Sequence, residues 1–147
     1  MKRTFVTTCA LLLLACGTIA AQGGWVTLFN GGSLDQWTPT GNVNWKVIGN
    51  ELWSTDGAGF LVSKQPYTDF EIRADVWVSP DANSGIFIRC QDAAKVGAAS
   101  CYEVNVYDTR PDQTYRTGSI VKVAEPAEFV YTGGQWNRLK ITAGGGR

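Results

Sequence analysis

Beyond residue 22 the chain alternates apolar and polar residues over short runs, with no helical stripe of useful length. Gly, Asn, Asp and Pro separate the runs, a pattern typical of an all-β sandwich or barrel. Gly49-Asn50 lies between two runs and predicts a two-residue hairpin turn. The expected strands cover residues 25–29, 45–48, 51–54, 59–63, 70–78, 84–90, 102–107, 119–123 and 136–142.

Three of these strands carry different chemistry on their two faces, because successive side chains of a strand point in opposite directions. One face is apolar, whereas the other gathers carboxylates, arginines, an asparagine and aromatic rings. This mixture suits hydroxyl recognition and ring stacking, although a solvated face with cross-strand ion pairs would alternate in the same way. The polar face comprises Glu71, Arg73, Asp75 and Trp77, then Phe87 and Arg89, then Glu103, Asn105 and Tyr107.

Composition narrows the range of functions. Basic and acidic residues number 13 each, so charge gives no case for nucleic acid or an anionic membrane as a partner. The chain has no histidine, which removes the commonest general base and metal ligand. A metal site would therefore need carboxylate and amide oxygens, and no acidic loop has convincing ligand spacing. We expect neither a metal nor a cofactor.

The first 21 residues resemble a secretory signal peptide. Lys2 and Arg3 form a positive start, an apolar run too short to span a bilayer follows, and small residues end the segment at Ala21. The remaining residues, 22–147, fit a single domain. We expect an exported protein, periplasmic or extracellular.

A lipid anchor is the alternative to ordinary cleavage. Leu13-Leu14-Ala15-Cys16 resembles a bacterial lipoprotein box, but Leu14 occupies a position that is usually small. A credible ordinary cleavage site follows it. We therefore favour cleavage after Ala21 and keep anchoring at Cys16 as the second interpretation.

Outside the signal segment the chain keeps two cysteines, Cys90 and Cys101. In an oxidising compartment two such cysteines are more often paired than free, so we expect a disulfide. Strand alternation argues against the pair, because Cys90 shares the parity of Ile88 whereas Cys101 shares that of Glu103. Both cysteines lie at strand ends, where alternation often fails.

Six fragments resemble the 3-keto-disaccharide hydrolase domain family, and they occur in the family's order between residues 25 and 142. Each fragment is short, so their number and order carry the resemblance. The fragments are Val26-Thr27-Leu28-Phe29-Asn30-Gly31-Gly32-Ser33-Leu34-Asp35-Gln36-Trp37, Trp45-Lys46-Val47, Tyr67-Thr68-Asp69-Phe70-Glu71-Ile72-Arg73, Asn83-Ser84-Gly85-Ile86-Phe87-Ile88-Arg89, Tyr102-Glu103-Val104-Asn105-Val106 (with Asn105 where Gln is usual) and Gly134-Gln135-Trp136-Asn137.

The resemblance implies a concanavalin A-like jelly-roll β-sandwich. It also implies a hydrolase for glycosides whose C3 hydroxyl has been oxidised to a ketone. Domains of this family usually continue with further strands after the Trp-Asn strand, whereas this sequence ends at Arg147. We therefore expect the sandwich to lack its last strands.

A ketone at C3 acidifies the C2 proton, because the carbanion left behind is an enolate. Elimination of the glycosidic oxygen at C1 and hydration then give net hydrolysis. These steps need a base, a cation for the enolate oxygen and an acid for the leaving oxygen. The expected catalytic residues are Glu103, Arg89 and Asp108; the expected substrate-binding residues are Glu71, Asp75, Trp77, Phe87, Asn105 and Tyr107.

Two other functions compete with this interpretation. Direct glycoside hydrolysis needs two carboxylates roughly 5 to 9 Å apart. Glu71 and Asp75 would lie about 13 Å apart along one strand, which disfavours it. A non-catalytic carbohydrate-binding module of the same fold stays open, since fold alone does not decide function.

Overall fold

The computed structural model describes residues 24–145, so the expected signal peptide, residues 1–21, and the expected anchoring site Cys16 lie outside the described residues. No helix within that range has the length and apolar character needed to cross a membrane. The elements of the described chain are β1 (Trp37–Gly41), β2 (Lys46–Ile48), β3 (Glu51–Trp53), β4 (Gly59–Ser63), β5 (Phe70–Trp77), β6 (Ser84–Ile88), β7 (Tyr102–Val106), the 3-10 helix η1 (Gln113–Tyr115) and β8 (Trp136–Ala143).

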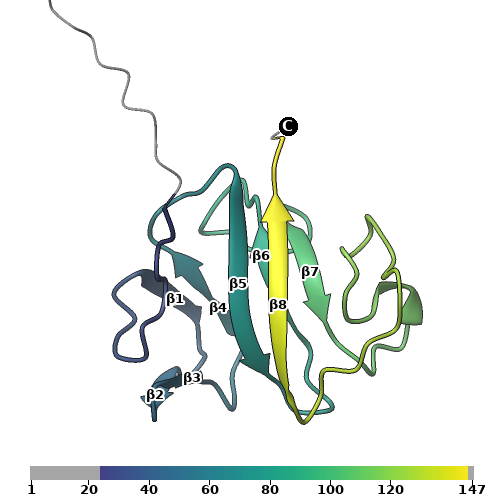
Figure 1. Ribbon diagram of the computed structural model, residues 1–147, viewed down its shortest axis with the longest axis horizontal. Helices are drawn as coiled ribbons and strands as arrows, with labels where there is room; N and C mark the ends of the chain where they lie inside the picture. Colours follow the sequence, from purple (N-terminus) through teal and green to yellow (C-terminus); the bar gives the residue numbers. More distant parts are fainter. Residues whose placement is uncertain (1–23, 146–147) are drawn as a thin grey trace, which may run out of the picture.

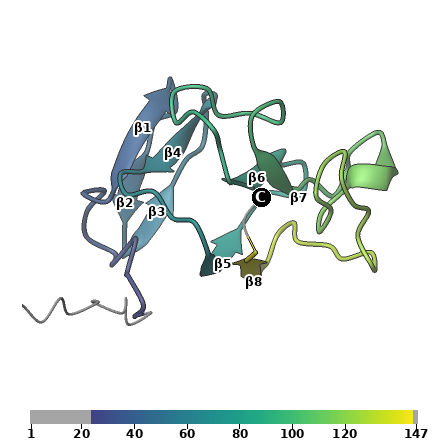
Figure 2. The ribbon, with the colours of Figure 1, turned by 90° about the horizontal axis from the view of Figure 1, so that it is seen from above.

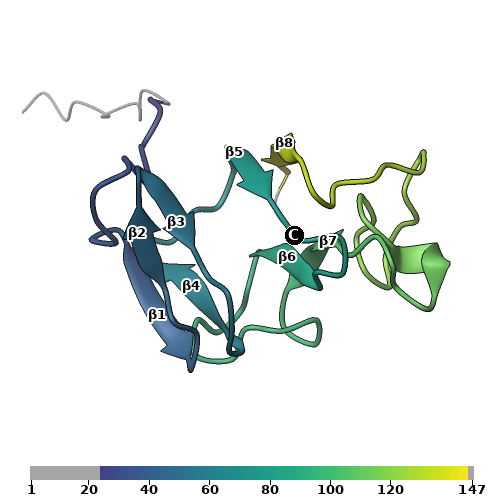
Figure 3. The same ribbon diagram turned by 90° about the horizontal axis from the view of Figure 1, so that it is seen from below.

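The strands form four antiparallel pairs: β1 with β4, β2 with β3, β5 with β8, and β6 with β7. Figure 1 shows β5 and β8 side by side across the middle of the molecule. Figures 2 and 3 show that these two strands form one layer and β6 and β7 another, with the remaining pairs to one side. The predicted all-β sandwich is confirmed.

The β5–β8 pair is the longest ladder, and its alternation follows the sequence. Its register runs without interruption from Phe70 opposite Ala143 to Trp77 opposite Trp136. Ile141 and Ala143 of β8 are buried, whereas Trp77 and Trp136 are largely exposed. The apolar face of this pair therefore points into the sandwich and the charged face points outward.

A pocket of about 210 Å³ lies between β7 and β8 and is open to solvent. Val104 and Val106 of β7 line it together with Leu139 of β8. Asn105 and Arg138, of the opposite parity, also line it, so the lining alone does not fix the orientation. Val106 is buried together with Ile141 and Ala143 of β8, and we therefore take the apolar parity of β7 to face β8. Because side chains alternate along a strand, Glu103 points to the opposite side of β7, away from the β5–β8 layer.

The hairpin predicted at Gly49-Asn50 is confirmed between β2 and β3. Both residues have positive φ, 58° for Gly49 and 68° for Asn50. Two consecutive residues of this kind are what a type I′ turn requires. Glycine and asparagine tolerate that conformation better than other residues, which is why the turn forms here.

Two expected strands are absent from the described chain, and one was not anticipated. Residues 25–29 form no strand, and the Trp37 indole instead donates a hydrogen bond to the Leu28 carbonyl at 2.6 Å. Residues 119–123 form mainly a turn, with an isolated bridge from Ile120 to Val104. The pattern of apolar and polar residues does not predict β1, because Pro39 lies in the middle of this strand. A proline is tolerated in an edge strand.

The predicted disulfide between Cys90 and Cys101 is present and closes the loop between β6 and β7. Arg89 has a φ of 52°, so the chain leaves extended geometry directly after β6 and the alternation that separated the two cysteines ends there. Closing a loop of this length stabilises the fold by about 3 kcal/mol in the chain-entropy model.

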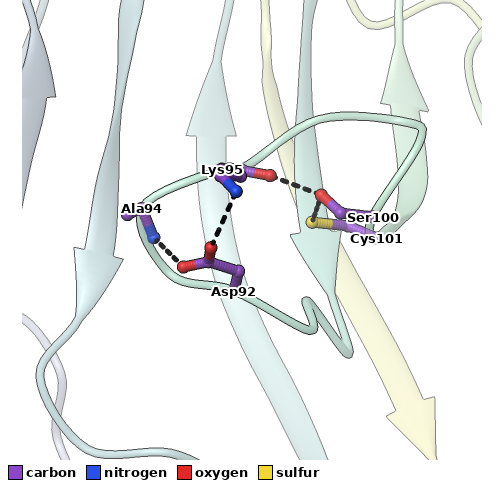
Figure 4. Close-up of polar contacts among 5 residues, drawn as sticks. All are labelled: Asp92, Ala94, Lys95, Ser100 and Cys101. Carbon is purple, nitrogen blue, oxygen red and sulfur yellow. Dashed lines mark hydrogen bonds and ion pairs between the residues drawn. The ribbon is translucent and has the colours of Figure 1, made fainter.

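Figure 4 shows the polar contacts inside this loop. The Asp92 carboxylate accepts a hydrogen bond from the Ala94 amide at 2.9 Å and pairs with the Lys95 ammonium at 3.8 Å. The Ser100 hydroxyl donates to the Lys95 carbonyl and lies 3.6 Å from the Cys101 sulfur. These contacts give the loop a defined shape beside the first residues of β7.

Candidate functional site

The candidate site lies on the side of β6 and β7 that faces away from the β5–β8 layer; we call this side the Glu103 face. Phe87 is opposite Glu103 in the register, and Gly85 is opposite Asn105. Backbone hydrogen bonds join β7 on its other edge to residues 118–121, through Asn105 to Ser119 and Val121 to Glu103, both at 3.0 Å. Two cross-strand rows result, one centred on Glu103 and the other on Asn105.

Glu103 is the distinctive ionisable group of this face. Within residues 24–145 no group donates a hydrogen bond to its carboxyl and no ion pair holds it. Burial raises the pKa of the Glu103 carboxyl, and the positive charge of Arg110 offsets part of that rise. A carboxylate in such surroundings is a stronger base than an ordinary glutamate.

Gly85 makes room for this carboxyl. A Cβ at Gly85 would lie 3.0 Å from the Val104 carbonyl oxygen and 3.3 Å from the Glu103 Oε1. A larger residue here would therefore push on the Glu103 side chain. The glycine of the Asn-Ser-Gly fragment positions the acid by leaving it space.

The cation near Glu103 comes from a loop. Arg110 follows β7 and is the positive charge that acts on the Glu103 carboxyl. Arg89, the expected cation, donates a 3.0 Å hydrogen bond to Asp69 instead and forms an ion pair with it. The positive φ of Arg89 turns it away from the regular course of β6.

Asn105 and Ser119 form a buried polar floor beside Glu103, with 1% and 0% of their surfaces exposed. The Asn105 amide donates to the Tyr115 carbonyl at 2.5 Å, which ties η1 down over β7. Within the described range, the Asn105 Oδ1 and the Ser119 Oγ have no hydrogen-bond partner. Both atoms keep hydrogen-bonding capacity beneath the η1 loop.

Arg116 fastens the same loop from its other end and is only 2% exposed. Its guanidinium lies 4.7 Å from the Phe129 ring centroid and 4.4 Å from that of Tyr131. It also donates hydrogen bonds to the Gln113 side chain at 2.9 Å and to the Val130 carbonyl at 3.0 Å. This cation is committed to packing the loop.

Asp108 is buried and accepts four hydrogen bonds, from the hydroxyls of Thr117 and Thr132 and from the amides of Thr132 and Gly133. Burial opposes its ionisation, but these hydrogen bonds outweigh that effect and lower the pKa of the Asp108 carboxyl. The carboxylate thus connects the end of β7 to the segment before β8. These hydrogen bonds indicate a structural role for Asp108, which holds the two segments together.

Phe87 and Tyr107 flank the site with part of their surfaces covered. The Phe87 ring packs edge-on against Phe60 of β4, with centroids 5.2 Å apart. The Tyr107 amide donates to the Thr117 hydroxyl at 2.8 Å. Phe87 therefore also serves as a packing contact between strand pairs.

The remaining expected site residues, Glu71, Asp75 and Trp77, lie on the outward face of β5. That face is on the opposite side of the sandwich from Glu103. The structure therefore brings Glu103, Phe87 and Asn105 together and leaves this second group apart. Strand alternation predicts a polar face for each group, but it does not specify whether two strands turn their polar faces to the same side of the sandwich.

A protein-family model described as a 3-keto-alpha-glucoside-1,2-lyase-like domain matches residues 24–147. The chain belongs to this family. The family is related to the lyases and hydrolases of 3-keto-glycosides, and its fold is concanavalin A-like. Neither the curated proteins nor the solved structures gave a match.

This 3-keto-glucoside lyase-like domain offers no three-residue cluster of His, Cys, Asp or Glu for a metal ion between residues 24 and 145. The Glu103 carboxyl is close enough to Arg110 for the positive charge to act on its pKa, and Asp108 has its oxygens occupied by protein donors. The chemistry that the Glu103 face supports is proton transfer next to a positive charge.

Three residues at or next to the candidate site, Arg110, Arg116 and Ser119, were not among those expected from the sequence. All three lie outside the regular strands, where a period of two does not apply. Arg110 directly precedes Pro111-Asp112 and Arg116 directly follows η1, and an arginine beside a turn is a weak signal. Residues 118–121 return to hydrogen-bond with β7, and this long-range contact places the segment that contains Ser119 next to the site.

Proposed function

We propose that this chain is an exported enzyme that cleaves glycosides whose C3 hydroxyl has been oxidised to a ketone. The observation that carries the proposal is the Glu103 carboxyl, partly buried, free of hydrogen-bond donors in the described chain and close enough to Arg110 to feel its charge. The family relationship supplies the substrate class.

Glu103 takes the proton from C2 of the sugar, and the electron pair of that C–H bond forms the enolate. The raised pKa of Glu103 suits this step, because a base of higher pKa has a larger driving force for accepting the proton. Arg110 stabilises the negative charge on the enolate oxygen. We place Arg110 in this role ahead of Arg89, whose guanidinium pairs with Asp69.

The enolate then collapses, the C1–O bond breaks, and the leaving oxygen takes a proton. Asp108 accepts hydrogen bonds from four groups, so we assign this second transfer to Glu103 as well. The carboxyl that received the C2 proton gives it to the leaving oxygen and is regenerated as the base. Water then adds across the resulting enone, which completes net hydrolysis.

Export accounts for the disulfide, since cystines persist in oxidising compartments. The expected mature protein lacks residues 1–21. Intact-mass measurement of exported material tests this: a mass that retains those residues contradicts cleavage, and a diacylglycerol adduct on Cys16 would replace the ordinary cleavage by a lipid anchor.

The decisive assay measures release of reducing sugar from 3-keto-trehalose and, beside it, from trehalose. The proposal expects release from the ketone only, because without the C3 carbonyl the C2 proton is not acidic. Equal rates on both sugars would indicate direct glycoside hydrolysis and overturn the elimination route.

A non-catalytic carbohydrate-binding module is the second candidate, and one observation favours it. Asp108 has its oxygens occupied, which leaves Glu103 as the unpaired carboxyl on this face of the described chain. A module would bind 3-keto-trehalose in calorimetry and release no product from it. An enzyme would do both.

A further inference from the structure

The outward face of β5 and β8 carries four cross-strand pairs in a straight ladder. They are Glu71 with Thr142, Arg73 with Lys140, Asp75 with Arg138, and Trp77 with Trp136. The last pair places two indoles directly opposite one another at the end of the ladder. Trp77 is 48% exposed and Trp136 is 57% exposed.

The two carboxylates and three cations of this ladder pair with one another, which leaves a net charge of +1. Asp75 accepts two hydrogen bonds from the Arg138 guanidinium, at 2.7 and 2.9 Å. Glu71 pairs with Arg73 at 2.7 Å and with Lys140 at 3.1 Å. The face therefore presents paired polar groups beside the two indoles, without a strong field of either sign.

A third indole lies further along the same face. The Arg73 guanidinium lies 4.4 Å from the centroid of the Trp25 ring, and Trp25 is 66% exposed. Arg73 and Trp77 are four residues apart on β5, a spacing of about 13 Å along the strand. Exposed aromatic surface thus occurs at both ends of this stretch.

We propose that this outward face is a second carbohydrate site, which binds an extended glucan chain by stacking pyranose rings on Trp77 and Trp136. Trp25 supplies a distal contact for longer chains. The flanking carboxylates and guanidinium groups exchange hydrogen bonds with sugar hydroxyls. The choice of ligand class rests on the proposed function, whereas the site itself is on the opposite side of the sandwich from Glu103.

Area and desolvation argue against a protein partner here. One indole side chain buries about 250 Å² at most, so two half-exposed indoles offer about that much together. A specific protein interface buries roughly 800 Å² on each partner. Covering the remaining ladder would also desolvate its ion pairs, which sugar hydroxyls can instead solvate.

The test uses the six indole N–H signals of the chain in NMR spectra of a Glu103→Gln variant, in which turnover is suppressed. The probes are cellohexaose and maltohexaose, each raised to about 10 mM, where even a millimolar site is largely filled. We expect one of the two glucans to shift the signals of Trp77 and Trp136. That result would also identify the preferred linkage.

Single variants Trp77→Ala and Trp136→Ala should each weaken binding roughly tenfold. Trp53→Ala is the matched control. Trp53 is likewise an exposed tryptophan, with 41% of its surface accessible, but it lies on β3, away from this ladder. It should bind as the parent does. Melting temperatures of all variants show whether the fold is kept.

Three outcomes overturn the proposal: neither glucan shifts these two indoles, Trp53 shifts as much as they do, or concentration-dependent dimerisation broadens them without glucan. None of these results bears on turnover of 3-keto-trehalose by the parent protein. Loss of that turnover with intact glucan binding would overturn only the proposed function.

Discussion

The two polar faces of this sandwich hold the same types of side chain in opposite electrostatic states. On the outward face, the hydrogen bond from Arg138 lowers the pKa of Asp75 against the effect of burial. On the other face, burial raises the pKa of Glu103 and Arg110 offsets only part of the rise. The local partners, and not the residue type, decide which carboxylate can act as a base.

Register explains the difference between the two faces. The β5–β8 pairing places a cation directly opposite Asp75, where a cross-strand ion pair forms. The β6–β7 pairing places Phe87 opposite Glu103, so no cation faces this carboxylate across the register. Satisfied carboxylates suit a binding or solvated face, and the unsatisfied one suits proton transfer.

The sharpest test of the comparison is Glu103→Gln, which keeps the shape of the side chain and removes the base. Turnover of 3-keto-trehalose should fall roughly 10²-fold or more. Glu125→Gln is the matched control, because Glu125 is exposed and lies outside the site. Normal turnover in Glu103→Gln would end the case for that residue.

A buried and fully bonded carboxylate should behave differently. Asp108→Asn replaces an acceptor of four hydrogen bonds by an amide that also carries donors, so it should cost about 2 kcal/mol of unfolding free energy. Urea unfolding measures this. Because the pKa of Asp108 is lowered, its stabilisation is present above the ordinary aspartate pKa and is lost as the pH falls through the folded value. An unchanged unfolding midpoint in the variant would contradict the anchoring role.

The raised pKa of Glu103 predicts the opposite pH dependence. Its protonated form is favoured in the folded state, so its contribution is present below the ordinary glutamate pKa and is lost as the pH rises through the folded value. Glu103→Gln should therefore raise the melting temperature at pH 7 and change it little well below pH 4.5, the ordinary glutamate value. An equal effect at both pH values would contradict the shift.

The smallest effect is expected on the outward face. Asp75→Asn removes an exposed ion pair, and such pairs contribute little because solvent screens them. Its melting temperature should change by an amount near the limit of detection, and the change should vanish at high salt. A loss of stability as large as that of Asp108→Asn would contradict the proposed difference between an exposed paired carboxylate and a buried one.

The sequence by itself determined the local features of this protein. A period of two assigned the polar and apolar faces of β5, β6 and β7, and Gly49-Asn50 placed a hairpin turn. Ordered fragments identified the family, and Glu103 was singled out by parity among aromatic residues. These features depend on neighbours within a few positions, so they can be deduced without the fold.

The tertiary structure decided everything that needed two distant segments to meet. It placed Glu71, Asp75 and Trp77 on the opposite side from Glu103, because β5 pairs with β8 and not with β7. It paired Trp77 with Trp136, gave Asp108 its four donors and brought Arg110 to Glu103 through a loop. Alternation specifies which side chains share a face of one strand. Only the packing of the strands specifies which faces of different strands lie on the same side of the sandwich.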